Sequence, residues 1–88
     1  MALNGGKPYI DKGNIRYFSV EQDKEEFVWH RDDEDRLIEV IEGQGWQLQM
    51  ENSLPFLLEQ NKKVYINKNV YHRLIKGYDD LTIKITKV

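Results

Sequence analysis

The feature that most constrains this chain is an alternation of apolar and polar residues with a period of two. Residues 81–87 show it most clearly, because three apolar side chains there are separated by polar ones: Leu81, Ile83 and Ile85. Residues 15–20 and 46–51 alternate in the same way. Successive side chains of a strand point to opposite faces, so each segment predicts a β-strand with one buried face. No segment sustains a helical pattern over three turns.

Five further short segments are rich in β-branched and aromatic residues and predict more strands: 26–30, 36–42, 55–58, 63–66 and 71–76. Turn-forming residues separate the segments, as at Gly43-Gln44-Gly45. A chain of 88 residues holds one domain. We therefore predict an all-β fold, a single small antiparallel β-barrel or jelly roll over residues 1–88, with residues 1–12 as a flexible start or edge segment.

The composition excludes several classes of function. The chain has no cysteine, which rules out disulfides, Fe–S clusters and thiol nucleophiles. No apolar run approaches the roughly 18 residues that a membrane helix needs, so we expect no membrane association and a cytoplasmic location. The net charge of -2 argues against a general nucleic-acid binder.

The charge is unevenly distributed along the chain. Residues 21–36 hold eight acids and three bases, a balance of -5, whereas residues 62–88 hold seven bases and two acids, a balance of +5. The simplest interpretation is two oppositely charged surfaces of one domain. An alternative function follows from the same pattern: a non-catalytic β-barrel that binds a protein or a nucleic acid through its basic C-terminal third.

The strand predicted at residues 36–42 has apolar side chains on both faces. Ile38 and Val40 share one face, and Leu37 and Ile41 share the other. A small barrel has only one interior, so the second apolar face predicts a homodimer interface or a covering N-terminal strand. A central strand buried on both sides within a sandwich would explain the pattern equally well.

Two segments around the only histidines, His30 and His72, carry the candidate chemistry. In the first, three residues separate Asp32 from Arg36, and six separate Arg36 from Gly43. In the second, residues 67–72 read Asn-Lys-Asn-Val-Tyr-His.

These two segments resemble the two motifs of the cupin superfamily. Its first motif runs His-x-His, three or four residues, Glu, six residues and Gly, and its second runs Pro-x-Gly-x-x-His. His30, Gly43 and His72 match the motifs, while Asn67 and Asn69 replace the Pro and the Gly. Asparagine adopts the left-handed backbone conformation more readily than most residues, so the exchange at Asn69 is mild. The resemblance covers most of the chain and implies a small barrel with an internal pocket.

The resemblance also implies a metal site, but the ligand set departs from the family. The family offers three His and one Glu, whereas here Asp32 replaces the second His and Arg36 replaces the Glu. His30, Asp32 and His72 remain, and two His with one carboxylate is a known facial set for Fe(II). Two interpretations stay open: a divalent metal (Fe, Mn, Ni or Zn) on these three residues, or a metal-free pocket in which Arg36 pairs with Asp32.

The predicted pocket implies a small-molecule ligand of unknown identity. Arg36 would bind an anionic group, since guanidinium groups pair well with carboxylates and phosphates. Three residues of the strand at 46–51 would form the apolar wall: Trp46, Leu48 and Met50. The family spans enzymes and non-catalytic proteins, so the fold alone selects no reaction.

Overall fold

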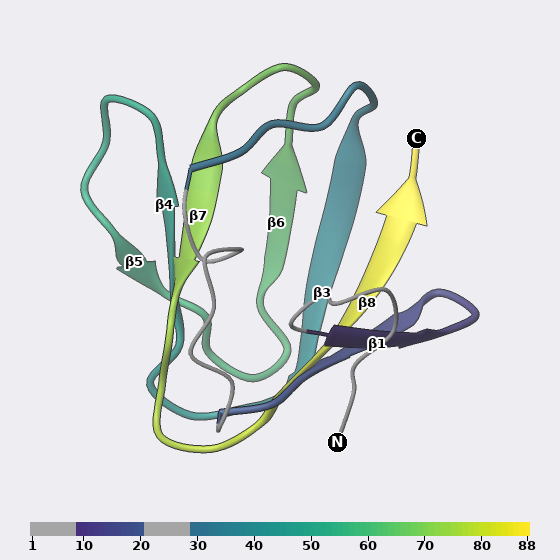
Figure 1. Cartoon of the computed structure of the whole chain (residues 1–88), viewed down its shortest axis with the longest axis vertical. Helices are drawn as coiled ribbons and strands as arrows, with labels where there is room; N and C mark the ends of the chain where they lie inside the picture. Colours follow the sequence, from purple (N-terminus) through teal and green to yellow (C-terminus); the bar gives the residue numbers. More distant parts are fainter. Residues whose placement is uncertain (1–8, 21–28) are drawn as a thin grey trace.

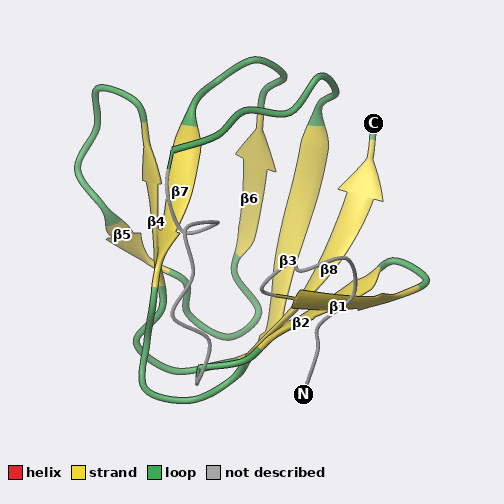
Figure 2. Cartoon of the chain, viewed as in Figure 1, coloured by secondary structure: helices red, strands yellow, loops and turns green. Residues whose placement is uncertain are grey.

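The computed structural model describes residues 9–20 and 29–88, and within them every regular element is a β-strand (Figure 2). Eight strands follow one another along the chain (Figure 1): β1 Tyr9–Lys12, β2 Ile15–Phe18, β3 Arg36–Glu42, β4 Gln47–Met50, β5 Phe56–Leu57, β6 Lys63–Ile66, β7 His72–Ile75 and β8 Leu81–Lys87. The observed bounds of β3, β6 and β8 agree with those predicted from the sequence, and β2, β4, β5 and β7 are each slightly shorter than predicted.

The strands form two antiparallel sheets. The larger has the order β1-β2-β8-β3-β6 and the smaller has the order β5-β4-β7. After β3 the chain crosses to the smaller sheet, and it crosses again between β5 and β6, β6 and β7, and β7 and β8. In Figure 1 the smaller sheet stands on the left and the larger sheet on the right. In this view β7 and β6 are the strands of the two sheets that lie next to each other.

The alternation of side chains places the core between the sheets. On β8, Leu81 and Ile83 are buried, and Ile83 is paired with the buried Val40 of β3. Trp46, which immediately precedes β4, is fully buried, and its indole donates a hydrogen bond to the Asp79 carbonyl. The core residues therefore come from the inward-facing positions that the period-two pattern predicted.

The all-β antiparallel prediction is confirmed for the described residues, but the closed barrel is not found. β7 and β6 are edge strands of different sheets and form no ladder with each other. The free edge of β7 is instead occupied at His72, whose backbone N–H and C=O both bond to His30. The edge of β7 at His72 is therefore paired with the segment before β3 rather than with β6.

Two segment predictions fall partly outside the described residues. Of the strand predicted at 26–30, residues 26–28 lie outside them, and His30 forms an isolated bridge rather than part of a strand. Of residues 1–12, the first eight lie outside them, and Tyr9–Lys12 form the edge strand β1.

The apolar side chains on the outer face of β3 are less buried than those on its inner face. Ile38 and Val40 are buried, whereas Ile41 is 38% exposed and Leu37 is half-buried. An apolar pair on the outer face of β3 is what the predicted homodimer would cover, and the homodimer stays a prediction that sedimentation at high micromolar concentration would test.

Replacing a core leucine tests the packing between the sheets. Leu81→Ala should lower the free energy of unfolding by about 2–5 kcal/mol, because it removes buried methyl groups and leaves a cavity. Leu54 is 85% exposed, so Leu54→Ala is a matched control that should change the free energy by about 0.5 kcal/mol or less. Urea unfolding measures both, and equal losses in the two variants would contradict this core.

Candidate metal and ligand site

Two backbone hydrogen bonds place the two histidines opposite each other. The His30 N–H donates to the His72 carbonyl at 3.0 Å, and the His72 N–H donates to the His30 carbonyl at 2.8 Å. Directly opposed residues of an antiparallel pair project their side chains to the same face. The imidazole rings accordingly lie edge to face, with centroids 4.4 Å apart. The sequence placed these histidines 42 positions apart, and the fold makes them neighbours.

The loop of the second motif positions Asp32. Asn69 has a φ of 64°, so the left-handed conformation predicted for it is confirmed. Its N–H donates to the Asp32 carbonyl at 2.7 Å. The adjacent Lys68 N–H donates to Asp35 Oδ1 at 2.7 Å. Two hydrogen bonds from the loop at Lys68 and Asn69 therefore join the two segments that resemble cupin motifs.

The ring of His72 is held in one tautomer. Its Nδ1 lies 2.8 Å from the Val70 carbonyl. A carbonyl oxygen only accepts, so Nδ1 carries the proton. Burial lowers the pKa of His72, and the nearby His30 and Arg36 act in the same direction, while Val70 and Asp32 oppose them. His72 is therefore neutral at neutral pH, and its unprotonated Nε2 lies 3.4 Å from Asp32 Oδ2.

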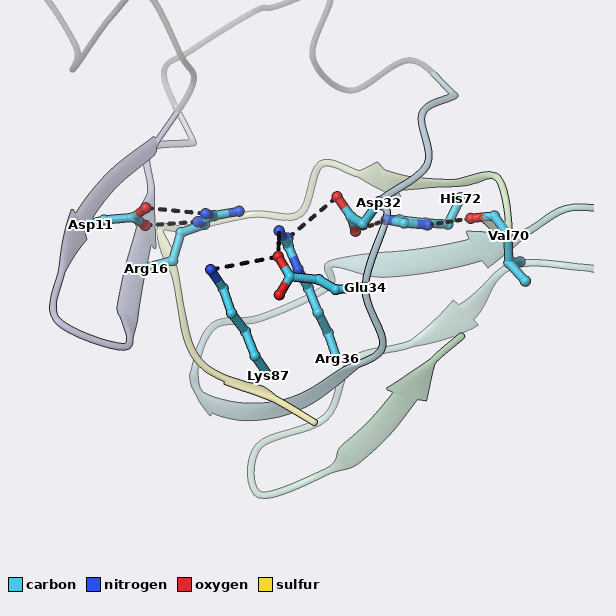
Figure 3. A network of polar contacts seen from close by, with 8 residues as sticks. All are labelled: Asp11, Arg16, Asp32, Glu34, Arg36, Val70, His72 and Lys87. Carbon is cyan, nitrogen blue, oxygen red and sulfur yellow. Dashed lines mark hydrogen bonds and ion pairs between the residues drawn. The ribbon is translucent and has the colours of Figure 1, made fainter. Parts of the chain in front are cut away.

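Asp32 is the centre of a continuous chain of polar contacts, shown in Figure 3. Its Oδ2 faces His72, and its Oδ1 lies 3.4 Å from Arg36 Nη1. Arg36 also lies 3.5 Å from Glu34, which lies 3.5 Å from Lys87 Nζ. Each oxygen of Asp32 thus has a different neighbour, so the contact with Arg36 leaves Oδ2 available to another cation.

The candidate residues line a cavity of about 320 Å³ between the sheets. Four predicted site residues line it: His30, Asp32, Arg36 and His72. His72 is buried and Asp32 is half-buried, whereas His30 is exposed. The group therefore lies where the cavity meets solvent, a position that a small molecule or ion can reach.

The predicted apolar wall is only partly correct. Leu48 lines the cavity. Trp46 does not, because its side chain is fully buried in the core, where its ring packs against Phe18. Met50 packs against the core and does not line the cavity either. The wall is completed by residues that the sequence did not assign to it, chiefly Phe18, Leu58, Leu74, Ile83 and Ile85.

Arg16 is a second cation that the sequence did not assign to the site. It lines the cavity beside Arg36. Its guanidinium bonds to Asp11 at 2.7 Å and 3.1 Å and lies 3.7 Å from the centroid of the Tyr9 ring. The alternation along the strand could have assigned Arg16 to the cavity, since Arg16 lies two residues before Phe18 and therefore shares its inward face.

His30, Asp32 and His72 have the composition and spacing of a metal site. Each offers one ligand atom, and these atoms all lie within 4.8 Å of one another.

No protein family, curated protein or solved structure matches the chain. None of the described residues belongs to a helix that is long and apolar enough to cross a membrane.

The lowered pKa of His72 predicts that the metal-free protein loses stability in mild acid. The unfolded state takes up the proton near the ordinary pKa of about 6.5, before the folded state does. The free energy of unfolding should therefore fall as the pH drops from about 7.5 to about 5.5. Urea unfolding in the presence of a chelator measures this fall.

His72→Gln is the control for this pH dependence, because it removes the titrating ring and keeps a polar side chain. The variant should lose less stability than the parent protein over the same pH range. An equal loss in the two proteins would show that His72 is not the group responsible.

Proposed function

We propose that this protein is a small cupin-like domain that binds a divalent metal ion through His30, Asp32 and His72 and a small molecule in the adjoining cavity. The single observation that carries the proposal is the contact between His72 and Asp32. A neutral Nε2 and a carboxylate oxygen both only accept hydrogen bonds, and they face each other at 3.4 Å. Two acceptors at this distance repel, and a cation between them turns the repulsion into two favourable bonds.

The distance itself fits a metal ion. Two ligand atoms that each lie about 2.1 Å from one ion at a tetrahedral angle are about 3.4 Å apart. The same separation is found between His72 Nε2 and Asp32 Oδ2. The Val70 carbonyl supports this use of the ring, since metal-binding histidines commonly donate their other N–H to a carbonyl or carboxylate.

His30 completes the proposed ligand set from the solvent side. Its exposure allows the imidazole to turn toward an ion held by the other two residues. Three protein ligands leave at least one coordination position for a bound molecule. An ion in this position would polarise a carbonyl or carboxylate group of that molecule.

The cupin-like jelly roll is part of the same proposal. Two antiparallel sheets around one cavity, the contact between the two motif loops and the left-handed Asn69 all support it. The competing function, binding of a protein or nucleic acid through the basic C-terminal third, would be supported by His30 and His72 exposed on one face with Lys68 and Arg73. Both histidines line the cavity instead, and His72 is buried, which favours the pocket.

Metal titration tests the proposal. The metal-free protein should bind one Co²⁺ or Zn²⁺ per chain, and Asp32→Asn should weaken binding by more than about tenfold, or about 1.4 kcal/mol, because it removes the charged ligand. Asp33 is an exposed neighbour outside the triad, so Asp33→Asn is a matched control that should bind the ion as the parent protein does. Equal affinities in the two variants would contradict the site.

A further inference from the structure

Arg36 has donor capacity that the described residues do not use. Its two ion-pair contacts, to Asp32 and Glu34, are long at 3.4 Å and 3.5 Å. Its Nε is buried and has no hydrogen-bond partner among the described residues. Buried donors are nearly always paired, so an unpaired guanidinium nitrogen beside a cavity indicates a missing acceptor.

Arg16 differs from Arg36 in this respect, although both line the cavity. Two nitrogens of Arg16 bond to Asp11, and its guanidinium is stacked over Tyr9. The guanidinium of Arg16 is therefore already bound by Asp11 and Tyr9 of β1. Among the described residues, Arg36 is the cavity-lining arginine that has a free donor for a ligand.

The rest of the cavity selects an apolar ligand body. Most of its lining is aliphatic or aromatic, including Phe18, Leu48, Leu58, Leu74 and Ile83. The volume of about 320 Å³ is roughly twice that of an apolar cavity of about 150 Å³ that holds benzene. One ring with a short substituent fits such a space.

Charge balance links this ligand to the metal ion. Along the polar chain, Arg36 and Lys87 are matched by Asp32 and Glu34 (Figure 3). A divalent ion on Oδ2 of Asp32 adds two positive charges, and Arg36 then shares the single negative charge of this carboxylate with the ion. The only other acid that lines the cavity or the adjoining hollow is Asp11, among the described residues, and it is paired with Arg16.

We infer that the cavity binds a small organic carboxylate with an apolar body, and that the carboxylate and the metal ion bind cooperatively. The carboxylate pairs with the guanidinium of Arg36, in the bidentate arrangement that such groups favour. Asp32 serves Arg36 alone when the site is empty and shares its charge with the ion when the site is filled. The cooperative part of this inference rests on the proposed metal function, whereas the carboxylate site itself does not.

The experiment uses Co²⁺ and benzoate as probes. Saturating benzoate should tighten Co²⁺ binding by about 5- to 50-fold, and Co²⁺ should tighten benzoate binding by the same factor. Benzyl alcohol, which has the same ring without the charge, should not tighten Co²⁺ binding. Acetate, which has the charge without the ring, should bind more weakly than benzoate.

Two variants locate the effect at Arg36. Arg36→Gln should abolish the effect of benzoate and still bind Co²⁺, and Arg36→Lys should retain only part of it, because an ammonium group lacks the bidentate geometry. Arg31 is exposed and lies over Tyr71, outside the cavity lining, so Arg31→Gln should behave as the parent protein does. Circular dichroism verifies that each variant is folded.

The outcomes separate this inference from the proposed function. Co²⁺ binding without any benzoate binding would overturn the inference and leave the metal site intact. An absence of Co²⁺ binding would overturn the metal site and the cooperativity together. In that case, benzoate binding in the presence of a chelator that Arg36→Gln abolishes would still support the carboxylate site, and binding that survives this substitution would overturn it.

Discussion

The reciprocal pair of backbone hydrogen bonds between His30 and His72 is the interaction on which the candidate site depends. It ties the segment before β3 to the edge of β7, so two residues that are distant in the sequence become directly opposed. Because opposed residues share a sheet face, both imidazoles reach the same cavity without any further adjustment. The same bonds occupy the edge of β7 at His72, and β7 forms no ladder with β6.

The site lies at a boundary between two environments, and its chemistry follows from that position. His72 is buried, which keeps its ring neutral, whereas His30 is exposed. Asp32 lies beside them, and its two oxygens face different groups, the His72 imidazole and the guanidinium of Arg36. The proposed binding of a cation and an organic anion rests on this set of groups: a neutral imidazole, a carboxylate and an arginine whose Nε is unpaired among the described residues, all beside an apolar wall.

Local patterns were sufficient to predict most of the strands, because each has a clear apolar face or sharp turn residues at its ends. The resemblance to the two motifs predicted that His30 and His72 converge. The tolerance of asparagine for a left-handed backbone explained why Asn69 can replace the glycine of the second motif. The choice between a closed barrel and two separate sheets was not predictable from local patterns. It depends on how strand edges pair, as at His72 of β7, whose partner His30 is distant in the sequence. Trp46 was misplaced for a related reason: an inward strand position can face the core or the cavity, and only the packing of the second sheet decides which.

The proposed metal site is tested most directly by ¹⁵N NMR of the imidazole nitrogens of His72, at neutral pH, before and after Zn²⁺ is added. In the metal-free protein we expect the proton on Nδ1, where the Val70 carbonyl accepts it, and an unprotonated Nε2. Zn²⁺ should then shift the Nε2 resonance strongly and leave the Nδ1 proton in place. A proton on Nε2 in the metal-free protein, or an Nε2 resonance unchanged by Zn²⁺, would contradict the account.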